Sequence, residues 1–239
     1  MTRDQCNTTP ATHPRVSRSN RLPRRACLDS MQALVVGPDA KDVEVRNHSL
    51  RVAEYAQIMG RRMRLRPSVI DSLNEAALMH DIGKLAVPES ILRKPGPLSI
   101  EEFEVIARHP AAARDILGHL RSLSRELSLI LHHHERYDGQ GYPAGLAGIR
   151  IPLEARILAV ADALDAMCSS RSYKPAYSLQ RVRSELVAGA GRQFDPDVTR
   201  IALSWLDEAA ARRCGRFRQA ETRTSSGRLR RSQFAEDGG

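Results

Sequence analysis

Histidine and aspartate residues cluster at a few points of this 239-residue chain, and the densest group lies in residues 131–143, LHHHERYDGQGYP. Three consecutive imidazoles there are followed by Asp-Gly and Gly-Tyr-Pro turn signals. Polar residues at predicted helix ends, or on otherwise apolar helices, are Glu44, His48, His80, Asp81, Lys84, His109, His133, His134, Asp162 and Asp165. Imidazoles and carboxylates without thiolates suit iron, manganese or zinc. This set therefore predicts a metal site.

The candidate ligands exceed what one ion needs. Asp81 directly follows His80, and its two carboxylate oxygens can bridge two ions. Roughly two or three ions, about 3.5–4 Å apart, can activate water and polarise a phosphoryl oxygen. Asp162 lies in an otherwise apolar segment, ARILAVADALDAM, where an unpartnered buried carboxylate is costly and a metal is one good partner. A lone helical histidine, in contrast, is more often structural.

The scaffold that positions these residues is predicted to be helical. The chain is 41% hydrophobic but only 4% aromatic, which favours helices packed on helices over a β-sandwich. Predicted helices cover residues 42–64, 68–80, 99–117 with a break at the His-Pro pair, 122–134, 153–167, 179–188 and 196–210. The prediction is a single all-α domain over residues 40–210, with about seven helices around a multinuclear metal site.

Local signals place several helix ends. Ser68 is a predicted N-cap, and Gly83 is a predicted left-handed C-cap after the histidine-aspartate pair. Ser99 and Glu102 have the spacing of a capping box. Pro110 suits the first turn of the helix that follows it.

The net charge of +9 is concentrated at the two ends of the chain. Residues 1–40 hold six Arg and three Asp (+3), and residues 211–239 hold eight Arg and three acids (+5), so residues 41–210 carry 9 − 8 = +1. Arginine-rich ends without aromatics favour solvated, disordered tails, here 1–39 and 211–239, over a specific nucleic-acid surface. Met31 is an alternative start within the first tail.

Two further features bear on location. No apolar run approaches the roughly 18 residues needed to span a bilayer, and no apolar signal-peptide core follows the N-terminus. The four cysteines form no CxxC pair, so neither a zinc knuckle nor a redox motif is predicted. A reduced, cytoplasmic protein is the expectation.

The ordered motifs carry a family resemblance. They are HSLRVA (48–53), HDIGKLAVP (80–88), ILRKPGPLS (91–99), HP (109–110), HHERYDGQGYP (133–143), ARILAVADALDAM (155–167), SRSYKPA (170–176) and GRQFDPDV (191–198). This set resembles the HD-GYP subgroup of the HD-domain metal-dependent phosphohydrolases. The resemblance implies an all-helical domain that holds two or three divalent ions, Fe(II) or Mn(II), and hydrolyses cyclic di-GMP to pGpG and in some members to GMP. Diguanylate cyclases (GGDEF proteins) and a second copy of the chain are further expected partners.

The resemblance assigns roles residue by residue. The implied metal ligands are Glu44, His48, His80, Asp81, His109, His133, His134 and Asp162. Lys84 and the bridging Asp81 are the implied catalytic residues. Arg171 and Lys174 match the residues that hold substrate phosphates, and Tyr142 matches a residue that lines the guanine or ribose pocket.

Some roles stay open at this level. Glu44 matches the ligand of a third ion in trinuclear members. Asp165 either orients a ligand histidine or Lys84, or forms a salt bridge or cap elsewhere. Arg51 either pairs with an acid near the site or lies on an exposed face. His132 is expected to be exposed or to support the ligands rather than to bind metal.

Three other functions compete with a cyclic di-GMP phosphodiesterase. The same metal site can act on another cyclic dinucleotide or on a nucleotide phosphate. The domain can instead be a scaffold that contacts diguanylate cyclases, although an intact ligand set argues against a purely structural role. Binding of nucleic acid through the arginine-rich ends is the least favoured, and it predicts strongly salt-dependent binding.

Overall fold

The computed structural model describes residues 43–170 and 175–212. Its α-helices are α2 (Val43–Arg62), α3 (Pro67–Met79), α4 (Glu89–Leu92), α5 (Ile100–Ala107), α6 (His109–Leu117), α7 (Ser124–Leu131), α8 (Leu153–Cys168), α9 (Leu179–Gly189) and a last helix over 196–212. Short 3-10 helices are η2 (Ile82–Ala86), η3 (Arg121–Leu123) and η4 (Gly148–Arg150). Within these two ranges no strand forms, so the predicted all-α class is confirmed. The predicted tails lie outside the described residues.

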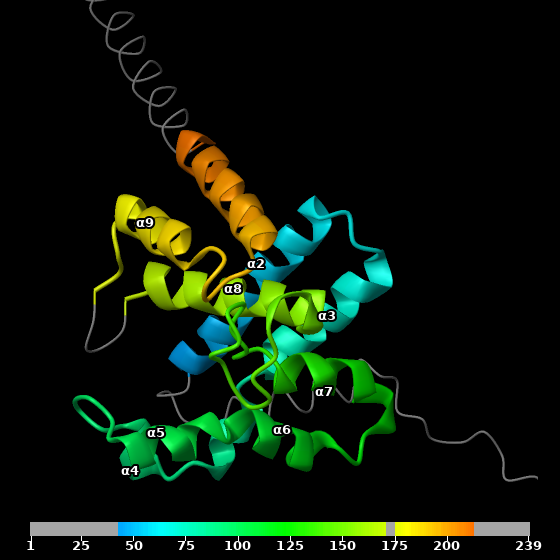
Figure 1. Ribbon diagram of the computed structural model, residues 1–239, viewed down its shortest axis with the longest axis vertical. Coiled ribbons are helices and arrows are strands. Elements are labelled where there is room, and N and C mark those ends of the chain that lie inside the picture. Colours follow the sequence, from blue (N-terminus) through cyan, green and yellow to red (C-terminus); the bar gives the residue numbers. More distant parts are fainter. Residues whose placement is uncertain (1–42, 171–174, 213–239) are drawn as a thin grey trace, which may run out of the picture.

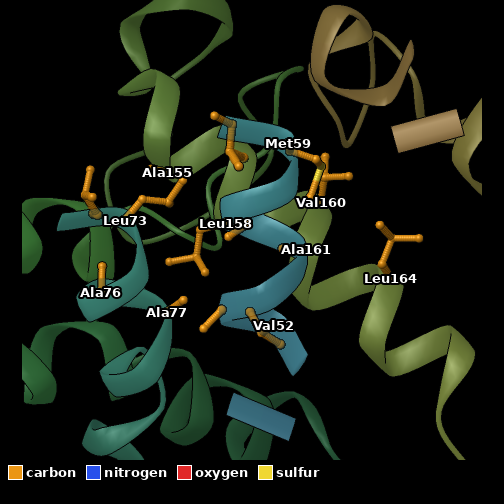
Figure 2. Packing of buried hydrophobic residues seen from close by; sticks show 14 of the residues in the cluster. Val52, Met59, Leu73, Ala76, Ala77, Ala155, Leu158, Val160, Ala161 and Leu164 are labelled. Carbon is orange, nitrogen blue, oxygen red and sulfur yellow. The ribbon is translucent and has the colours of Figure 1, made fainter. Parts of the chain in front are cut away.

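The core is centred on α2, α3 and α8, which pack against one another (Figure 1). Val52 of α2, Leu73 of α3 and Leu158 of α8 are fully buried and point into one cluster (Figure 2). Full burial of such a side chain contributes about 1.5–3 kcal/mol. Because this packing holds the three helix backbones in place, it also holds His48 and Asp162, each one turn from Val52 or Leu158, and His80, which directly follows the buried Met79.

A second layer of helices completes the support for those polar residues. Helices α6 and α7 pack against each other, α7 packs on α3, and η2 packs on α6 (Figure 1). The α4–α5 hairpin lies at the edge of this layer, and neither of its helices contributes a buried residue. No helix in the described ranges is long and apolar enough to cross a membrane.

Two predicted helix ends are wrong by a few residues. Helix α3 begins at Pro67 rather than after a Ser68 cap, because proline suits the first helical position, where its missing N–H is not needed. Helix α7 ends at Leu131 rather than at His134, and the chain turns sharply over the following histidines. The capping box at Ser99 is confirmed.

Gly83 has a different role from the predicted left-handed cap. It lies inside η2, and a Cβ added there would lie 1.8 Å from the carbonyl oxygen of His109. The glycine therefore permits η2 to approach the first turn of α6 closely. This contact brings the segment that carries Asp81 next to His109.

Candidate metal centre

Three buried histidines lie just beyond helix C-termini. His80 caps α3, His109 follows α5, and His133 follows α7. Their Nδ1 atoms lie 2.7, 2.8 and 2.6 Å from the carbonyl oxygens of Ala77, Ile106 and Ile130, respectively. The last carbonyls of a helix have no intrahelical N–H partner, so each accepts a hydrogen bond from the imidazole Nδ1–H. This bond orients each ring and leaves the Nε2 lone pair free for a ligand.

The Nε2 atoms of the same three histidines are buried and lack hydrogen bonds to the described residues. The side chains of His80, His109 and His133 are each only 1% exposed. A buried polar atom without a partner is costly, and a cation removes that cost by accepting the lone pairs. The partial negative charge of the three helix C-termini also favours a cation. The residues present therefore fit bound metal.

Asp81 lies between these histidines, with its two carboxylate oxygens directed to different rings. Oδ2 is 3.5 Å from His80 Nε2 and 3.8 Å from His48 Nε2, whereas Oδ1 is 3.7 Å from His109 Nε2. Burial by itself opposes ionisation of Asp81, but His80 and then Lys84 outweigh it and hold the pKa well below its usual value. An ionised carboxylate with one oxygen toward His80 and His48 and the other toward His109 is placed as a ligand that could bridge two ions.

The potential ligand atoms form overlapping sets. Within each set they lie within 4.8 Å of one another, and the sets are His48, His80 and Asp162; His80, Asp81 and His133; and His109, His133 and His134. These residues come from α2, from the segments after α3 and α7, from the start of α6 and from α8. Shared members make these sets one continuous group of potential ligand atoms rather than separate groups.

His48 is oriented by a carboxylate instead of a helix carbonyl. Its Nδ1 lies 2.7 Å from Asp165 Oδ2, and Arg51 donates to the same carboxylate through Nε and Nη2 at 2.5 and 3.1 Å. Burial raises the pKa of Asp165, but the bonds from His48 and Arg51 outweigh it and lower that pKa to about 2. An ionised Asp165 requires His48 to donate from Nδ1, which directs the Nε2 lone pair toward Asp81 and Asp162.

The buried carboxylate of α8 is therefore not the one expected from the sequence. Asp165 is 0% exposed, whereas the side chain of Asp162 is 24% exposed and faces the site. Asp162 Oδ1 lies 3.4 Å from His48 Nε2. The argument that a buried aspartate needs a partner thus applies to Asp165, and its partners are Arg51 and His48.

The pKa values of His133 and His134 are depressed. Burial lowers the pKa of His133 well below its usual value, and the neighbouring His134 adds to the effect. Burial, followed by repulsion from His109, lowers the pKa of His134 to about 3. These rings stay neutral near pH 7, so they need not lose a proton to bind a metal.

The loop after His134 is built to bring its backbone back to the site. Glu135 accepts hydrogen bonds from the backbone N–H groups of Ala144 (2.7 Å) and Leu146 (3.0 Å). A Cβ on Gly141 would lie 2.3 Å from the backbone nitrogen of Arg136, so only glycine fits there. Glu135 thus shapes this loop. His132 is absent from the three ligand sets, and its Nδ1 lies 3.5 Å from Glu135 Oε1.

Two of the remaining predicted site residues border the ligand sets. Lys84 donates from Nζ to Asp81 Oδ2 at 2.7 Å. The ring of Tyr142 lies 5.0 Å from that of His134, centre to centre. Arg171 and Lys174 lie outside the described residues, as does the side chain of Glu44.

A groove of about 400 Å³ adjoins the ligand sets along α8. Its lining includes His133, His134 and Asp162, followed along α8 by the small side chains of Ala163 and Ala166. Small residues on this face of the helix leave room beside the candidate metal ligands. The groove therefore gives a bound molecule direct access to the centre.

Comparisons with known proteins identify the family. A model of the HD domain family matches residues 24–198. The chain belongs to the HD domain family. With the HHExxDGxGYP element at residues 133–143, this HD domain is of the HD-GYP type.

Relatives of this HD domain carry two kinds of name. It is 38% identical over 196 residues to a cyclic di-GMP phosphodiesterase of Vibrio cholerae, a match that covers 76% of this chain and 39% of the relative. It is 37% identical over 177 residues to the 3'3'-cGAMP-specific phosphodiesterase 2 of the same organism, covering 72% and 34%. The chain thus spans less than half the length of either relative.

A solved structure supports the fold alone. The HDG"Y"P protein Bd1817 from Bdellovibrio bacteriovorus superposes with a TM-score of 0.58 at 16% identity, covering 77% of this chain and 63% of that one. This likeness agrees with the helical architecture that positions the histidines.

Sequence reasoning did not identify every residue that shapes the centre. The carbonyls of Ala77, Ile106 and Ile130 carry no side-chain signal, although a histidine just after each apolar helix indicates where to look. Phe103 of α5 was also not recognised, and its ring lies against Tyr142.

Proposed function

We propose that this HD domain is a metal-dependent phosphodiesterase that hydrolyses cyclic di-GMP to pGpG and, by a second cleavage, to GMP. The observation that carries the proposal is that the buried Nε2 atoms of His80 and His109 converge on Asp81, with His133 in the same ligand group. Among the described residues, none of these three Nε2 atoms has a hydrogen-bond partner. The name of the 38% identical relative supports the substrate.

The ligand sets suit divalent ions, and nitrogen and oxygen donors without thiolates suit iron, manganese or zinc. The resemblance to the HD-GYP family favours Fe(II) or Mn(II). One ion would be held by His48, His80, Asp81 and Asp162, and another by Asp81, His109, His133 and His134. Glu44 would hold a third. Bound ions supply Lewis-acid polarisation of a phosphoryl oxygen and activation of water.

The chain's own residues would position the phosphodiester and balance its charge. Lys84, paired with Asp81, places a positive charge beside the ligand sets. Arg171 and Lys174 would hold the substrate phosphates, and Tyr142 would contact a nucleotide beside His134. In the reaction, water adds to phosphorus and the bond to the ribose 3′ oxygen breaks, so that each molecule of water opens one phosphodiester.

The decisive experiment is turnover by protein loaded anaerobically with Fe(II) or Mn(II). Cyclic di-GMP should be converted to pGpG or GMP, resolved by chromatography, with bound metal measured in the same sample. Asp81→Asn should abolish turnover because the bridging carboxylate loses one anionic oxygen. Absence of turnover by the wild-type protein with metal bound contradicts the proposal.

A second candidate substrate is a mixed-base cyclic dinucleotide, because one relative at 37% identity is named as 3'3'-cGAMP-specific. Comparing kcat/KM for cyclic di-GMP and 3'3'-cGAMP decides between them. A scaffold role with diguanylate cyclases predicts instead that Asp81→Ala leaves the cellular phenotype unchanged. The homodimer expected from the resemblance is tested by light scattering of the full chain.

A further inference from the structure

A line of aromatic rings runs from the metal ligands to the protein surface. The ring of Tyr142 lies 5.0 Å from that of the ligand candidate His134, with an interplanar angle of 36°. The ring of Tyr142 also contacts the ring of Phe103, on α5, edge to face, with ring centroids 5.9 Å apart and an interplanar angle of 90°. Phe103 is 50% exposed. The two perpendicular rings form a corner, here called the aromatic corner, at the edge of the centre.

Packing of the fold does not account for Phe103. Helix α5 contributes no buried residue, and neither does α4, with which it forms the hairpin at the edge of the molecule (Figure 1). A phenylalanine buried in a core contributes about 1.5–3 kcal/mol, and a half-exposed ring gives up much of that gain. Ile100, one turn earlier on α5, is 77% exposed. The hairpin thus leaves apolar side chains exposed without using them to stabilise the core, and of these Phe103 contacts Tyr142.

We propose that Phe103, beside Tyr142, packs against a purine base of the substrate and so determines affinity for nucleotides over simple phosphodiesters. This rests on the proposed function, since it names how that same site recognises its substrate. A planar base that stacks on one ring of the corner meets the edge of the other, which is the favoured contact for both. Base–aromatic stacking contributes about 1–3 kcal/mol per base.

The position of the corner suits a nucleotide whose phosphate lies at the metal ligands. A base is separated from its phosphate by one ribose, and Tyr142 is in ring contact with the ligand candidate His134. The Tyr142 hydroxyl can donate a hydrogen bond to a base or ribose oxygen.

The test compares two substrates, cyclic di-GMP and bis(p-nitrophenyl) phosphate, which has no purine. Phe103→Ala should raise the KM for cyclic di-GMP by about 5–150-fold, the equivalent of one lost stacking contact, with kcat little changed. Hydrolysis of bis(p-nitrophenyl) phosphate should be affected less, because its nitrophenyl rings present a smaller stacking surface than a purine. Phe103→Trp should retain the wild-type KM because it keeps an aromatic face. Ile100→Ala is the matched control, an exposed apolar residue on the same helix, and should behave as wild type.

Each contrary result has a defined meaning. An unchanged KM for cyclic di-GMP in Phe103→Ala overturns the role of the corner. Equal losses on both substrates, accompanied by a lower melting temperature, also overturn it, because Phe103 then only supports the fold. If the wild-type protein cleaves bis(p-nitrophenyl) phosphate but no cyclic dinucleotide, the proposed function itself has failed. The two failures are therefore distinguishable.

Discussion

Replacement of Asp165 by asparagine tests whether the carboxylate behind His48 sets the metal affinity of the centre. Asparagine keeps the shape of the side chain but removes the charge that accepts from His48 Nδ1 at 2.7 Å and from Arg51 at 2.5 and 3.1 Å. It can also present its NH₂ group to His48, which favours the wrong tautomer of the ring. We expect Asp165→Asn to bind metal about 10–100-fold more weakly, the effect typical of losing a group that orients a ligand histidine.

The stability cost can be worked from the same contacts. The pKa of Asp165 falls from 3.8 to about 2 on folding. At about 1.4 kcal/mol per unit, the interactions of the ionised carboxylate stabilise the folded state by about 2 kcal/mol at neutral pH. This stabilisation is present above pH 3.8 and is lost as the pH falls toward 2. Removing it should lower the melting temperature of the metal-free variant by roughly 4–8 °C.

The matched control is Asp195→Asn. Asp195 is also buried and pairs with an arginine, Arg156, while it accepts backbone N–H bonds from Asp197 and Val198. Both variants should lose stability, but only Asp165→Asn should lose metal affinity, measured by anaerobic competition with a chelating indicator. Wild-type metal affinity in Asp165→Asn, or equal losses in the two variants, would refute the reasoning.

Three further outcomes are expected. Gly83→Ala should reduce metal content and melting temperature together, because its Cβ would lie 1.8 Å from the His109 carbonyl oxygen; metal analysis and thermal melting check this. Metal-free protein should lose stability as the pH falls below 6.5, because the pKa of His134 is about 3 in the folded state and the unfolded chain binds the proton. His134 should contribute about 1 kcal/mol to the difference in unfolding free energy between pH 7.5 and 5.5, measured with urea, and His134→Asn should reduce the difference by that amount. Glu44→Gln should lower the metal content by about one ion per chain if Glu44 holds a third ion, and an unchanged content contradicts that role.

Much of the fold and of the candidate ligand set could be predicted from local sequence. The capping box at Ser99 and the helix start at the His109-Pro110 pair were predicted because capping depends on residues within one turn. Helix spacing and apolar faces gave the all-α class for the same reason. Two helix ends were misplaced, the start of α3 at Pro67 and the end of α7 at Leu131. At each of them, the neighbouring residues are compatible with a helix boundary at more than one position.

Pairings between distant residues were decided only by the tertiary structure. Asp165 had several open roles in the sequence, and its contact with His48 spans 117 positions. Gly83 looked like a helix cap until the approach of His109 showed that the absence of a Cβ is what matters. The Phe103 ring acquired a role only through its contact with Tyr142.

The sequence by itself determined which chemical groups are available: imidazoles and carboxylates placed at helix ends, in an order that resembles one family. The tertiary structure determined which atom of each group faces the centre. Helix carbonyls accept from Nδ1 of His80, His109 and His133, and each Nε2 is left buried without a partner among the described residues. The physical reason is that a helix end exposes its carbonyls locally, whereas the convergence of several such ends depends on how the core packs.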